Sequence, residues 1–577
     1  MDTQTVTLKI NDRPVTVPKG STLLQAAREA GVRIPTLCHV EGLSPTGACR
    51  LCVVEVAGTG RLLPSCAYPA EEGMSIDTRS VSVRRARKTI VELLLANHRQ
   101  DCLYCVKNLQ CELQALAAEY GVREKRFEGR IRAYHQDLSS PALERDPEKC
   151  ILCGRCVRVC EEIQQVGAID FTRRGFDTMV LPAFNRDLSL SPCTYCGQCI
   201  PECPTGALRE KSHLKQVWNA LNDPDMFVVA QVAPAIRVAL GEEFGLPAGT
   251  VVTGRIPAAL HRLGFQRAFD TNLAADLTIM EEASELIHRL QHGQPLPMLT
   301  SCSPGWVKYI EHFYPELLPN VSTCKSPHMM LGALVKSYFA RKEGLDPAKI
   351  FVVSIMPCTA KKYEAQRPEM ASPEGWRDVD AVLTTRELAR MIRTAGIQFG
   401  RLGDVPFDEP LGIATGAGDI FGASGGVMEA ALRSAHFLLT GKEDARVDFE
   451  QVRGLAGVKA ATVELAGTTL RVAAVSDLKN AGAVLEQIRT GSAPYQFVEI
   501  MCCPGGCING GGQPLPRSRE ILQARANAIY EIDREKPARR SHQNTGVQKL
   551  YEEFLEKPHS EAAHRLLHTH YTGRTRY

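Results

Sequence analysis

Alternating apolar and polar residues open the chain and predict a β-hairpin. The runs VTLKI (6–10) and RPVTV (13–17) are separated by Asn11 and Asp12, a pair that favours a two-residue turn. Gly20, Ser21 and Thr22 precede the segment LLQAAREAG, so a short helix is expected there. The basic, leucine-rich segment 79–97 predicts a second helix.

From about Asp223 onward, short apolar runs alternate with helix-like segments. Examples are MFVVAQVAP (226–234), IFVVSIMPC (350–358) and VDAVLTTREL (379–388). Strands that lead into helices predict an α/β domain. Cysteines follow directly after several of these runs, and sheets of this kind hold their sites at those strand ends.

Length and composition fit a multidomain globular protein. The 577 residues suggest about four domains. The net charge of +3 gives no argument for a nucleic-acid partner. The N-terminus lacks the basic and apolar regions of a signal peptide, and no run of 18 apolar residues occurs, so a cytoplasmic protein without a membrane span is expected. In a reducing cytoplasm the 21 cysteines are interpreted as metal ligands or catalytic thiols.

Fifteen of these cysteines lie between Cys38 and Cys203, in three groups. The first has a CxxC pair with one cysteine before and one after it, and it resembles a plant-type 2Fe–2S ferredoxin with a longer first spacing. A zinc site is the alternative. The expected ligands are Cys38, Cys49, Cys52 and Cys66.

The second group has only three cysteines, one fewer than a 4Fe–4S cluster needs. A histidine precedes them in the pattern HxxxCxxCxxxxxC, which resembles a known His-ligated cluster module. A structural role for the histidine is the alternative. The expected ligands are His98, Cys102, Cys105 and Cys111.

The third group repeats CxxCxxCxxxC twice and resembles bacterial two-cluster ferredoxins, in which the fourth cysteine of each copy binds the other cluster. One 4Fe–4S cluster is therefore assigned to Cys150, Cys153, Cys156 and Cys203, and the other to Cys160, Cys193, Cys196 and Cys199. Four accessory clusters in series are typical of one-electron transport between a surface and a buried site.

Three further segments carry the chemistry: TSCSPGW (300–306), MPCTAKKYE (356–364) and EIMCCPGGCINGGGQP (499–514). Together they resemble the FeFe hydrogenases, and the resemblance extends over nearly the whole chain. It looks closest to long, multi-cluster forms that serve as catalytic subunits of NAD(P)-linked complexes. It implies an H-cluster, a 4Fe–4S cube joined through a cysteine sulfur to a di-iron azadithiolate centre with CO and cyanide ligands.

The resemblance implies an α/β catalytic domain with two sheet-containing lobes around the H-cluster, preceded by small α+β ferredoxin-like domains. The expected domains are a 2Fe–2S domain (1–78), a His-ligated module (79–140), a two-cluster domain (141–215), the catalytic domain (216–515) and a helical, small-subunit-like segment (516–577).

Residue by residue, the resemblance assigns the cube ligands Cys358, Cys503 and Cys507, with Cys507 as the bridge to the di-iron centre. Lys361 matches the lysine that hydrogen-bonds a cyanide, and Met356 matches a methionine beside the bridging CO. Other residues expected around the cofactor are Pro234, Ala235 (where a serine is common), Gly505 and Gly506.

One position departs from the family motif TSCCPGW. Its first cysteine shuttles protons and its second ligates the cube, but here the pair is Cys302 and Ser303. Either Ser303 ligates through oxygen, or Cys302 takes over ligation, or another thiol such as Cys502 does. Cys324 matches no ligand and is expected to be a buried structural thiol.

A proton route is also implied, running outward from Cys302 through Glu282, Ser322 and Glu285 to Arg289. The spacing of three and four residues places the two glutamates and the arginine on one helix face. A solvated helix face is the alternative interpretation.

The predicted function is reversible oxidation of H₂ and reduction of protons, with electrons leaving through the four accessory clusters. Expected partners are an NAD(P)H-linked flavoprotein and a thioredoxin-like 2Fe–2S subunit, with free ferredoxin as the alternative. The competing interpretations are a sensory hydrogenase, a non-catalytic iron–sulfur assembly protein and an electron-wire subunit. No GxGxxG motif follows a strand, so a nicotinamide would bind to another subunit.

Overall fold

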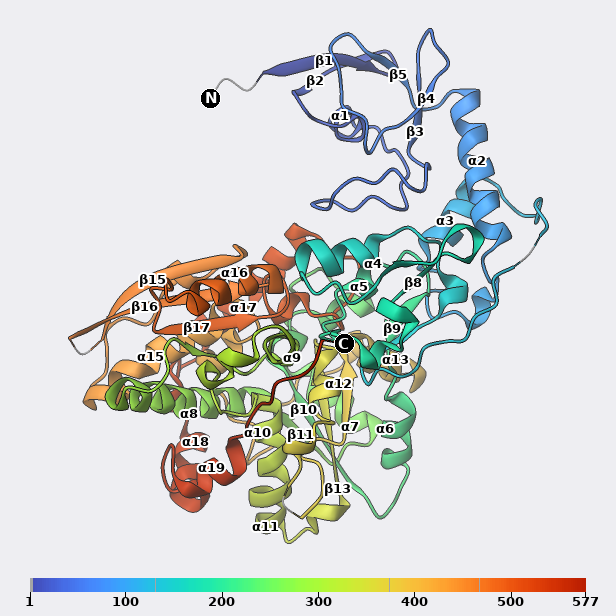
Figure 1. The fold of residues 1–577 in the computed structure, drawn as a ribbon. Helices are drawn as coiled ribbons and strands as arrows, with labels where there is room; N and C mark the ends of the chain where they lie inside the picture. The colour runs from blue at the N-terminus through green and yellow to red at the C-terminus, as the bar shows by residue number, and fades with distance from the viewer. Residues whose placement is uncertain (1–3, 130, 373, 466, 577) are drawn as a thin grey trace.

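The N-terminal part of the molecule is a small five-stranded sheet that stands apart from the main body (Figure 1). The computed structural model describes residues 4–129, 131–372, 374–465 and 467–576. Asn11 and Asp12 adopt positive φ angles of 48° and 66° and close the expected hairpin. Thr22 caps the first helix in a capping box with Gln25. The strand order is β2-β1-β5-β3-β4, with elements β1 (Thr5–Ile10), β2 (Arg13–Pro18), α1 (Leu23–Glu29), β3 (Val53–Val56), β4 (Leu62–Pro64) and β5 (Ser75–Asp77).

Helix α2 (Val81–Ala96) connects this sheet to the main body (Figure 1). It packs against α3 (Glu112–Glu119) through Val91, Leu113 and Leu116. Two small antiparallel sheets follow, β6 with β9 and β7 with β8. Their elements are β6 (Leu143–Arg145), α4 (Arg155–Arg158), β7 (Asp170–Thr172), β8 (Met179–Leu181), α5 (Cys199–Glu202) and β9 (Leu208–Glu210).

The first lobe of the main body is a parallel sheet of order β11-β10-β13-β14. Its strands are continuous apolar runs because helices cover them, and they form the largest buried core. The elements are α6 (Leu214–Leu221), β10 (Phe227–Val232), α7 (Arg255–Leu263), β11 (Arg267–Asp270), α10 (Pro327–Leu334), α11 (Ala340–Glu343), β13 (Ile350–Met356), α12 (Ala360–Glu364), β14 (Ala381–Thr384) and α13 (Thr385–Thr394).

The second lobe is a mixed sheet of order β12-β17-β16-β15, in which only β15 and β16 pair antiparallel. The two lobes confirm the expected α/β architecture. The elements are β12 (Met298–Leu299), α9 (Pro304–Phe313), α14 (Gly416–Ile420), α15 (Gly426–Thr440), β15 (Val458–Leu465), β16 (Thr468–Ser476), α16 (Leu478–Arg489), β17 (Phe497–Met501) and α17 (Arg519–Glu535).

Helix α8 (Thr271–His292) connects the two lobes, because it contacts β10 of the first and packs on α15, which contacts β16 and β17 of the second. The C-terminal helices α18 (Thr545–Leu550) and α19 (Glu561–Leu567) lie beside α8 and α10 (Figure 1). Among the described residues, no helix is both long and apolar enough to cross a membrane.

Candidate active site and iron–sulfur sites

A largely apolar cavity lies where strands of both lobes end. Cys302 follows β12, Cys358 follows β13 and Cys503 follows β17, so three loops bring thiols to one place. The lining residues are Ala233, Pro234, Thr271, Cys302, Ser303, Pro304, Pro327, His328, Met356, Pro357, Cys358, Lys361, Phe421, Met501, Cys502, Cys503, Gly506, Cys507 and Gly510. Ala235 and Gly505, both expected here, are neighbours of lining residues but do not line the cavity themselves.

The thiols of this cavity are buried, and burial disfavours a free thiolate. Burial raises the pKa of Cys507 to about 12, with Cys503 adding to the effect and Lys361 opposing it. The pKa of Cys358 is raised for the same reason. Buried thiolates need a compensating cation, and soft sulfur donors suit iron. The donor set therefore fits an iron–sulfur cofactor.

Lys361, on the first turn of α12, reaches across to the loop after β12. Its Nζ donates to the carbonyl oxygen of Cys302 at 3.0 Å and to Glu364 Oε2 at 2.7 Å. His328 Nε2 lies 2.7 Å from the same carboxylate oxygen. Burial tends to raise the pKa of Glu364, yet Lys361 and His328 lower it to about 2. The ammonium group is thus fixed at the cavity wall by an ionised carboxylate.

Sequence reasoning missed Glu364 and His328 as partners of this lysine. Glu364 lies three residues after Lys361 in a helix, a spacing that indicates a pair. His328 carried no such signal, because it comes from α10 and meets Glu364 only through the tertiary fold.

Ser303 and Cys502 are neighbours in the cavity wall. Ser303 Oγ accepts a hydrogen bond from the Cys502 backbone N–H at 3.2 Å. The Cys502 thiol contacts both Cys503 and Cys196, which raise its pKa. It also occupies the space beside Gly305, where a Cβ would come within 2.8 Å of the sulfur. Cys502 therefore lies between the main cavity and the neighbouring cysteine cluster.

The expected proton-route residues on α8 are buried, so the solvated-face interpretation is wrong. Glu282 is fully buried, and its Oε1 is 3.4 Å from the Ser301 backbone nitrogen, while its Oε2 has no hydrogen-bond partner. Burial and the nearby Glu285 raise the pKa of Glu282 to about 8. A buried carboxyl with a free oxygen and a pKa near neutrality is suited to proton transfer.

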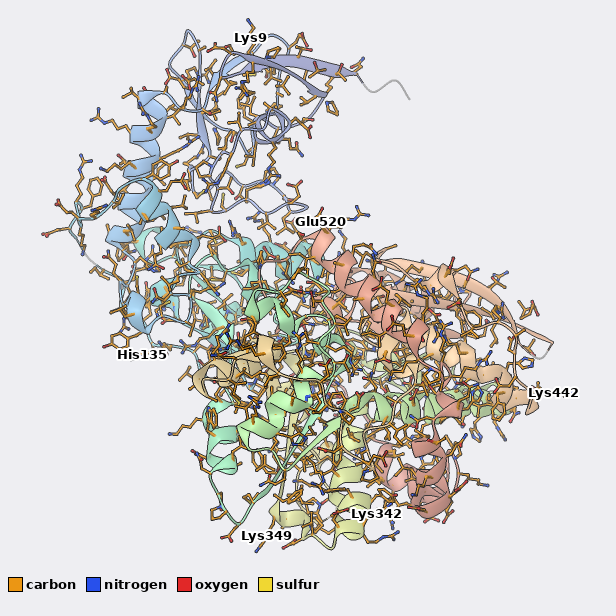
Figure 2. All side chains as sticks on the ribbon, turned by 180° about the vertical axis from the view of Figure 1, so that it is seen from behind. Lys9, His135, Lys342, Lys349, Lys442 and Glu520 are labelled. Carbon is orange, nitrogen blue, oxygen red and sulfur yellow. The ribbon has the colours of Figure 1, made fainter. Side chains whose placement is uncertain are left out.

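The outer part of the route is a tighter network. Ser322 Oγ donates to Glu285 Oε2 at 2.8 Å, and the same residue lowers the pKa of Glu282 against the effect of burial. Arg289 Nη2 donates to Glu285 Oε1 at 2.6 Å, and the same nitrogen donates to the Val321 carbonyl at 2.9 Å. The fold thus brings these side chains into one chain of contacts. In contrast, the labelled Lys342, Lys349 and Lys442 lie around the outline of the molecule in Figure 2.

The repeated cysteine motifs form two separate cavities with exchanged fourth residues, as the motif predicts. Burial raises the pKa of Cys150 to about 11 and that of Cys153 to about 12. One cavity is lined by Cys150, Cys153, Cys156 and Cys203, and the other by Cys160, Cys193, Cys196 and Cys199.

The His-ligated module is only partly assembled. His98, Cys102 and Cys111 line one cavity, and the buried His98 Nδ1 has no hydrogen-bond partner, as expected of a nitrogen reserved for a metal. Cys105 does not line this cavity; its sulfur lies beside Gly206. In the N-terminal domain, the Cys52 and Cys66 sulfurs are 3.3 Å apart, and the Cys38 thiol contacts Cys49 and Cys66.

The glycine run after Cys503 allows close backbone packing. A Cβ at Gly506, where φ is 94°, would come within 2.5 Å of the Ser424 backbone nitrogen. A Cβ at Gly510 would come within 2.2 Å of the Pro357 carbonyl oxygen. Gly506 thus brings the CPGGC loop against the segment before α15, and Gly510 brings the following glycines against the loop after β13.

Family models match five stretches of the chain. They describe a 2Fe–2S iron-sulfur cluster binding domain (3–81), an NADH-ubiquinone oxidoreductase-G iron-sulfur binding region (87–126) and a 4Fe-4S dicluster domain (149–207). The remaining two are the iron only hydrogenase large subunit, C-terminal domain (226–511), and the iron hydrogenase small subunit (519–574).

Relatives match over the full length. The NADP-reducing hydrogenase subunit HndD of Solidesulfovibrio fructosivorans is 48% identical, with 99% of each chain covered. Iron hydrogenase 1 of Clostridium pasteurianum is 41% identical, covering 98% of this chain and 99% of its own. Cytosolic iron-sulfur assembly component 3 of Rattus norvegicus is 33% identical but covers 67% of this chain.

A solved apo form of an FeFe hydrogenase from Chlamydomonas reinhardtii has a TM-score of 0.58 and 42% identity, covering 63% of this chain and all of that one. The assembly component therefore matches less of the chain, at lower identity, than the two full-length hydrogenases do. The chain belongs to the iron-only, or FeFe, hydrogenase family and is a hydrogenase with accessory iron–sulfur domains.

Proposed function

We propose that this hydrogenase is the H₂-converting subunit of a cytoplasmic NAD(P)-linked complex, and that it oxidises H₂ and reduces protons reversibly. The observation that carries the proposal is one apolar cavity lined by Cys358, Cys503 and Cys507, next to Lys361 and the unpaired carboxyl of Glu282. The relative HndD gives further support, since it is named as an NADP-reducing hydrogenase subunit.

Cys358, Cys503 and Cys507 would hold the cube of an H-cluster, with Cys507 bridging to the di-iron centre. When bound, that cofactor supplies the heterolytic cleavage of H₂ through its di-iron and azadithiolate groups. Lys361 would fix a cyanide ligand by charge, since Glu364 keeps its ammonium group at the wall. Pro234, Met356 and Gly506 would shape the cavity, with Ala235 and Gly505 supporting it from behind.

Cys502 would be the fourth ligand of the cube. The carbonyl of Cys302 is held by Lys361, and its thiol lies near Glu282, so Cys302 is better placed to move protons. Of the two remaining groups, Cys502 offers a thiolate and Ser303 a hydroxyl, and iron in such clusters prefers the softer donor. Ser303 would then support the Cys502 backbone through its hydrogen bond.

Protons would pass between Cys302, Glu282, Ser322 and Glu285, and leave past Arg289. Each group can donate or accept at the contact it makes, with the exception of the arginine, which stays charged. The protein's part is to keep water out and to hold Glu282 at a pKa near neutrality.

Electrons would leave through one 2Fe–2S and three 4Fe–4S clusters, held by the three cysteine groups and His98. We assign these groups to domains at 1–78, 79–140 and 141–215, ahead of the catalytic domain (216–515) and the C-terminal segment (516–577). The contact of Cys502 with Cys196 supports transfer between the main cavity and the nearest accessory cluster. The flavoprotein and thioredoxin-like subunits would receive the electrons from the N-terminal end.

Infrared spectroscopy of the matured protein tests the cofactor. We expect CO and cyanide stretching bands, and their absence after confirmed maturation would contradict the proposal. The partner is tested by purifying the tagged chain from its host and assaying H₂-dependent reduction of NADP and NAD. Co-purification of a flavoprotein, together with nicotinamide reduction, supports the complex. Activity with ferredoxin alone would contradict it and identify ferredoxin as the electron partner.

A further inference from the structure

Five histidines gather at the outer end of the proton route. His288 and His292 come from the last turns of α8, and their rings stack at 4.1 Å. His559, His564 and His568 come from the C-terminal segment, and the His559 ring stacks on His288 at 5.3 Å. We call these five residues the histidine cluster; none of them has a role in the proposed function.

The histidine cluster connects surface and interior. His292 and His564 are exposed, His288 and His559 are half-buried, and His568 is buried with 9% of its surface left exposed. His564 Nε2 lies 3.0 Å from His559 Nδ1, and the His564 and His568 rings are 4.1 Å apart. The histidine rings therefore form a continuous series of contacts from the exposed His564 to the buried His568.

His568 is joined to Glu285 through one hydroxyl. Its Nδ1 is 2.8 Å from Thr323 Oγ1, and that oxygen lies 3.4 Å from Glu285 Oε2. A threonine hydroxyl can accept one proton while donating another. Thr323 can therefore pass a proton between the imidazole and the carboxylate.

The other face of His568 meets a buried carboxylate. Glu281 is fully buried, and its Oε2 lies 3.2 Å from His568 Nε2. Tyr551 donates to Glu281 Oε1 at 2.6 Å. Among the described residues, His568 is the one basic side chain that pairs with Glu281. Glu281 therefore fixes the ring orientation of His568, which turns Nδ1 toward Thr323.

Arg289 is poorly suited to carry the proton itself. Its guanidinium remains protonated in proteins. Its nitrogens are also occupied by Glu285 and by the carbonyls of Pro319 and Val321. It can position Glu285, but it cannot release and regain a proton at neutral pH.

We propose that the histidine cluster is a proton entrance that serves Glu285 through His568 and Thr323, an inference that rests on the proton route of the proposed function. A proton from solvent reaches His568 through the histidine cluster and is carried at Nε2, where it is shared with Glu281 Oε2. The proton on Nδ1 then moves to Thr323 Oγ1 as the threonine hydroxyl proton moves to Glu285. The same steps run in reverse during H₂ oxidation.

The matched pair Thr323→Val and Thr323→Ser tests this branch in the matured full chain. Valine has nearly the same shape but no hydroxyl, whereas serine keeps it. His568→Gln removes the imidazole, and His570→Gln, an exposed change in the same segment, is its control. The readouts are H₂ evolution from reduced methyl viologen, its solvent isotope effect, the infrared bands and iron content.

We expect Thr323→Val and His568→Gln to evolve H₂ at least tenfold more slowly with a larger solvent isotope effect, while infrared bands and iron content stay unchanged. Thr323→Ser and His570→Gln should stay within twofold of the parent. Parent rates in Thr323→Val, alongside an inactive Glu282→Gln, would overturn the histidine branch and leave the proposed function intact. Parent rates in Glu282→Gln would overturn the whole route, and this branch with it.

Discussion

Replacing Glu282 with glutamine is the sharpest test of the proton route. Glutamine keeps the shape of the side chain and can still receive the weak contact from the Ser301 backbone at 3.4 Å. The change removes only the ability to take up and release a proton. Because Glu282 Oε2 has no hydrogen-bond partner, no ion pair is broken and the fold should be preserved.

The size of the effect follows from the environment of this carboxyl. A positioned acid or base typically contributes about 10²- to 10⁴-fold in rate. This range corresponds to about 2.7–5.4 kcal/mol of activation free energy. Glu282 is fully buried, so bulk water cannot replace it directly. We therefore expect turnover to fall by about 10²-fold or more.

The pH dependence has opposite signs in the two directions. With a pKa of about 8, Glu282 is mostly protonated at pH 7 and mostly ionised at pH 9. Proton reduction needs the protonated form, so its rate should decline as the pH rises through about 8. H₂ oxidation needs the ionised form, so its rate should rise over the same interval and then level off.

The assay is H₂ evolution and H₂ uptake with artificial mediators between pH 6 and 10, with infrared bands and iron content measured on the same samples. Glu531→Gln, an exposed change on α17, is the control for handling and maturation. A Glu282→Gln protein with intact infrared bands and near-parent turnover would refute the reasoning. So would a parent pH profile with no change near pH 8 in either direction.

Four further changes test other parts of the structure. When the chain is produced without di-iron maturation, Cys502→Ala should lose the iron of one cluster, about four atoms, while Ser303→Ala should keep it. Iron analysis and EPR of the reduced cluster measure this loss. The reverse pattern would assign ligation to the serine. Lys361→Met should retain the cube but weaken the infrared bands of the di-iron centre, because the charge at the cavity wall is lost. Burial tends to raise the pKa of Glu210, but Arg386 and a second arginine lower it to about 2. The contribution of Glu210 to the free energy of unfolding is therefore present above pH 4.5 and lost as the pH falls toward 2. Glu210→Gln should lower the free energy of unfolding near neutral pH and make it depend less on acid pH, as measured by pH-jump denaturation.

Features set by short sequence spacing were predictable. The Asn11–Asp12 turn depends on adjacent residues, and the crossed cysteine sets follow from a repeated motif of fixed spacing; the structure has the turn and brings each cysteine set to one cavity. Spacing also placed Glu282 and Glu285 on one helix face. It could not reveal that this face is buried, because burial depends on lobes formed by distant segments.

The remaining features depend on tertiary contacts. His568 meets Glu281 across 287 residues of sequence, and His328 meets Glu364 across 36. Neither pair has a local pattern, so a single sequence gave no signal for them. The close packing of Gly506 on Ser424 and of Gly510 on Pro357 likewise joins segments that are far apart in the sequence.

The three glutamates of α8 indicate why this helix lies between the lobes. Burying Glu281, Glu282 and Glu285 together costs stability, since each carboxylate loses its hydration. Arg289 pairs with Glu285 and His568 with Glu281, whereas Glu282 has no ion pair among the described residues, and burial raises its pKa to about 8. A helix selected for stability alone would carry apolar residues here, as most positions of the neighbouring α10 do. The route thus runs from Glu285, which is paired with Arg289, to Glu282, whose pKa of about 8 lets it donate or accept a proton beside the cavity.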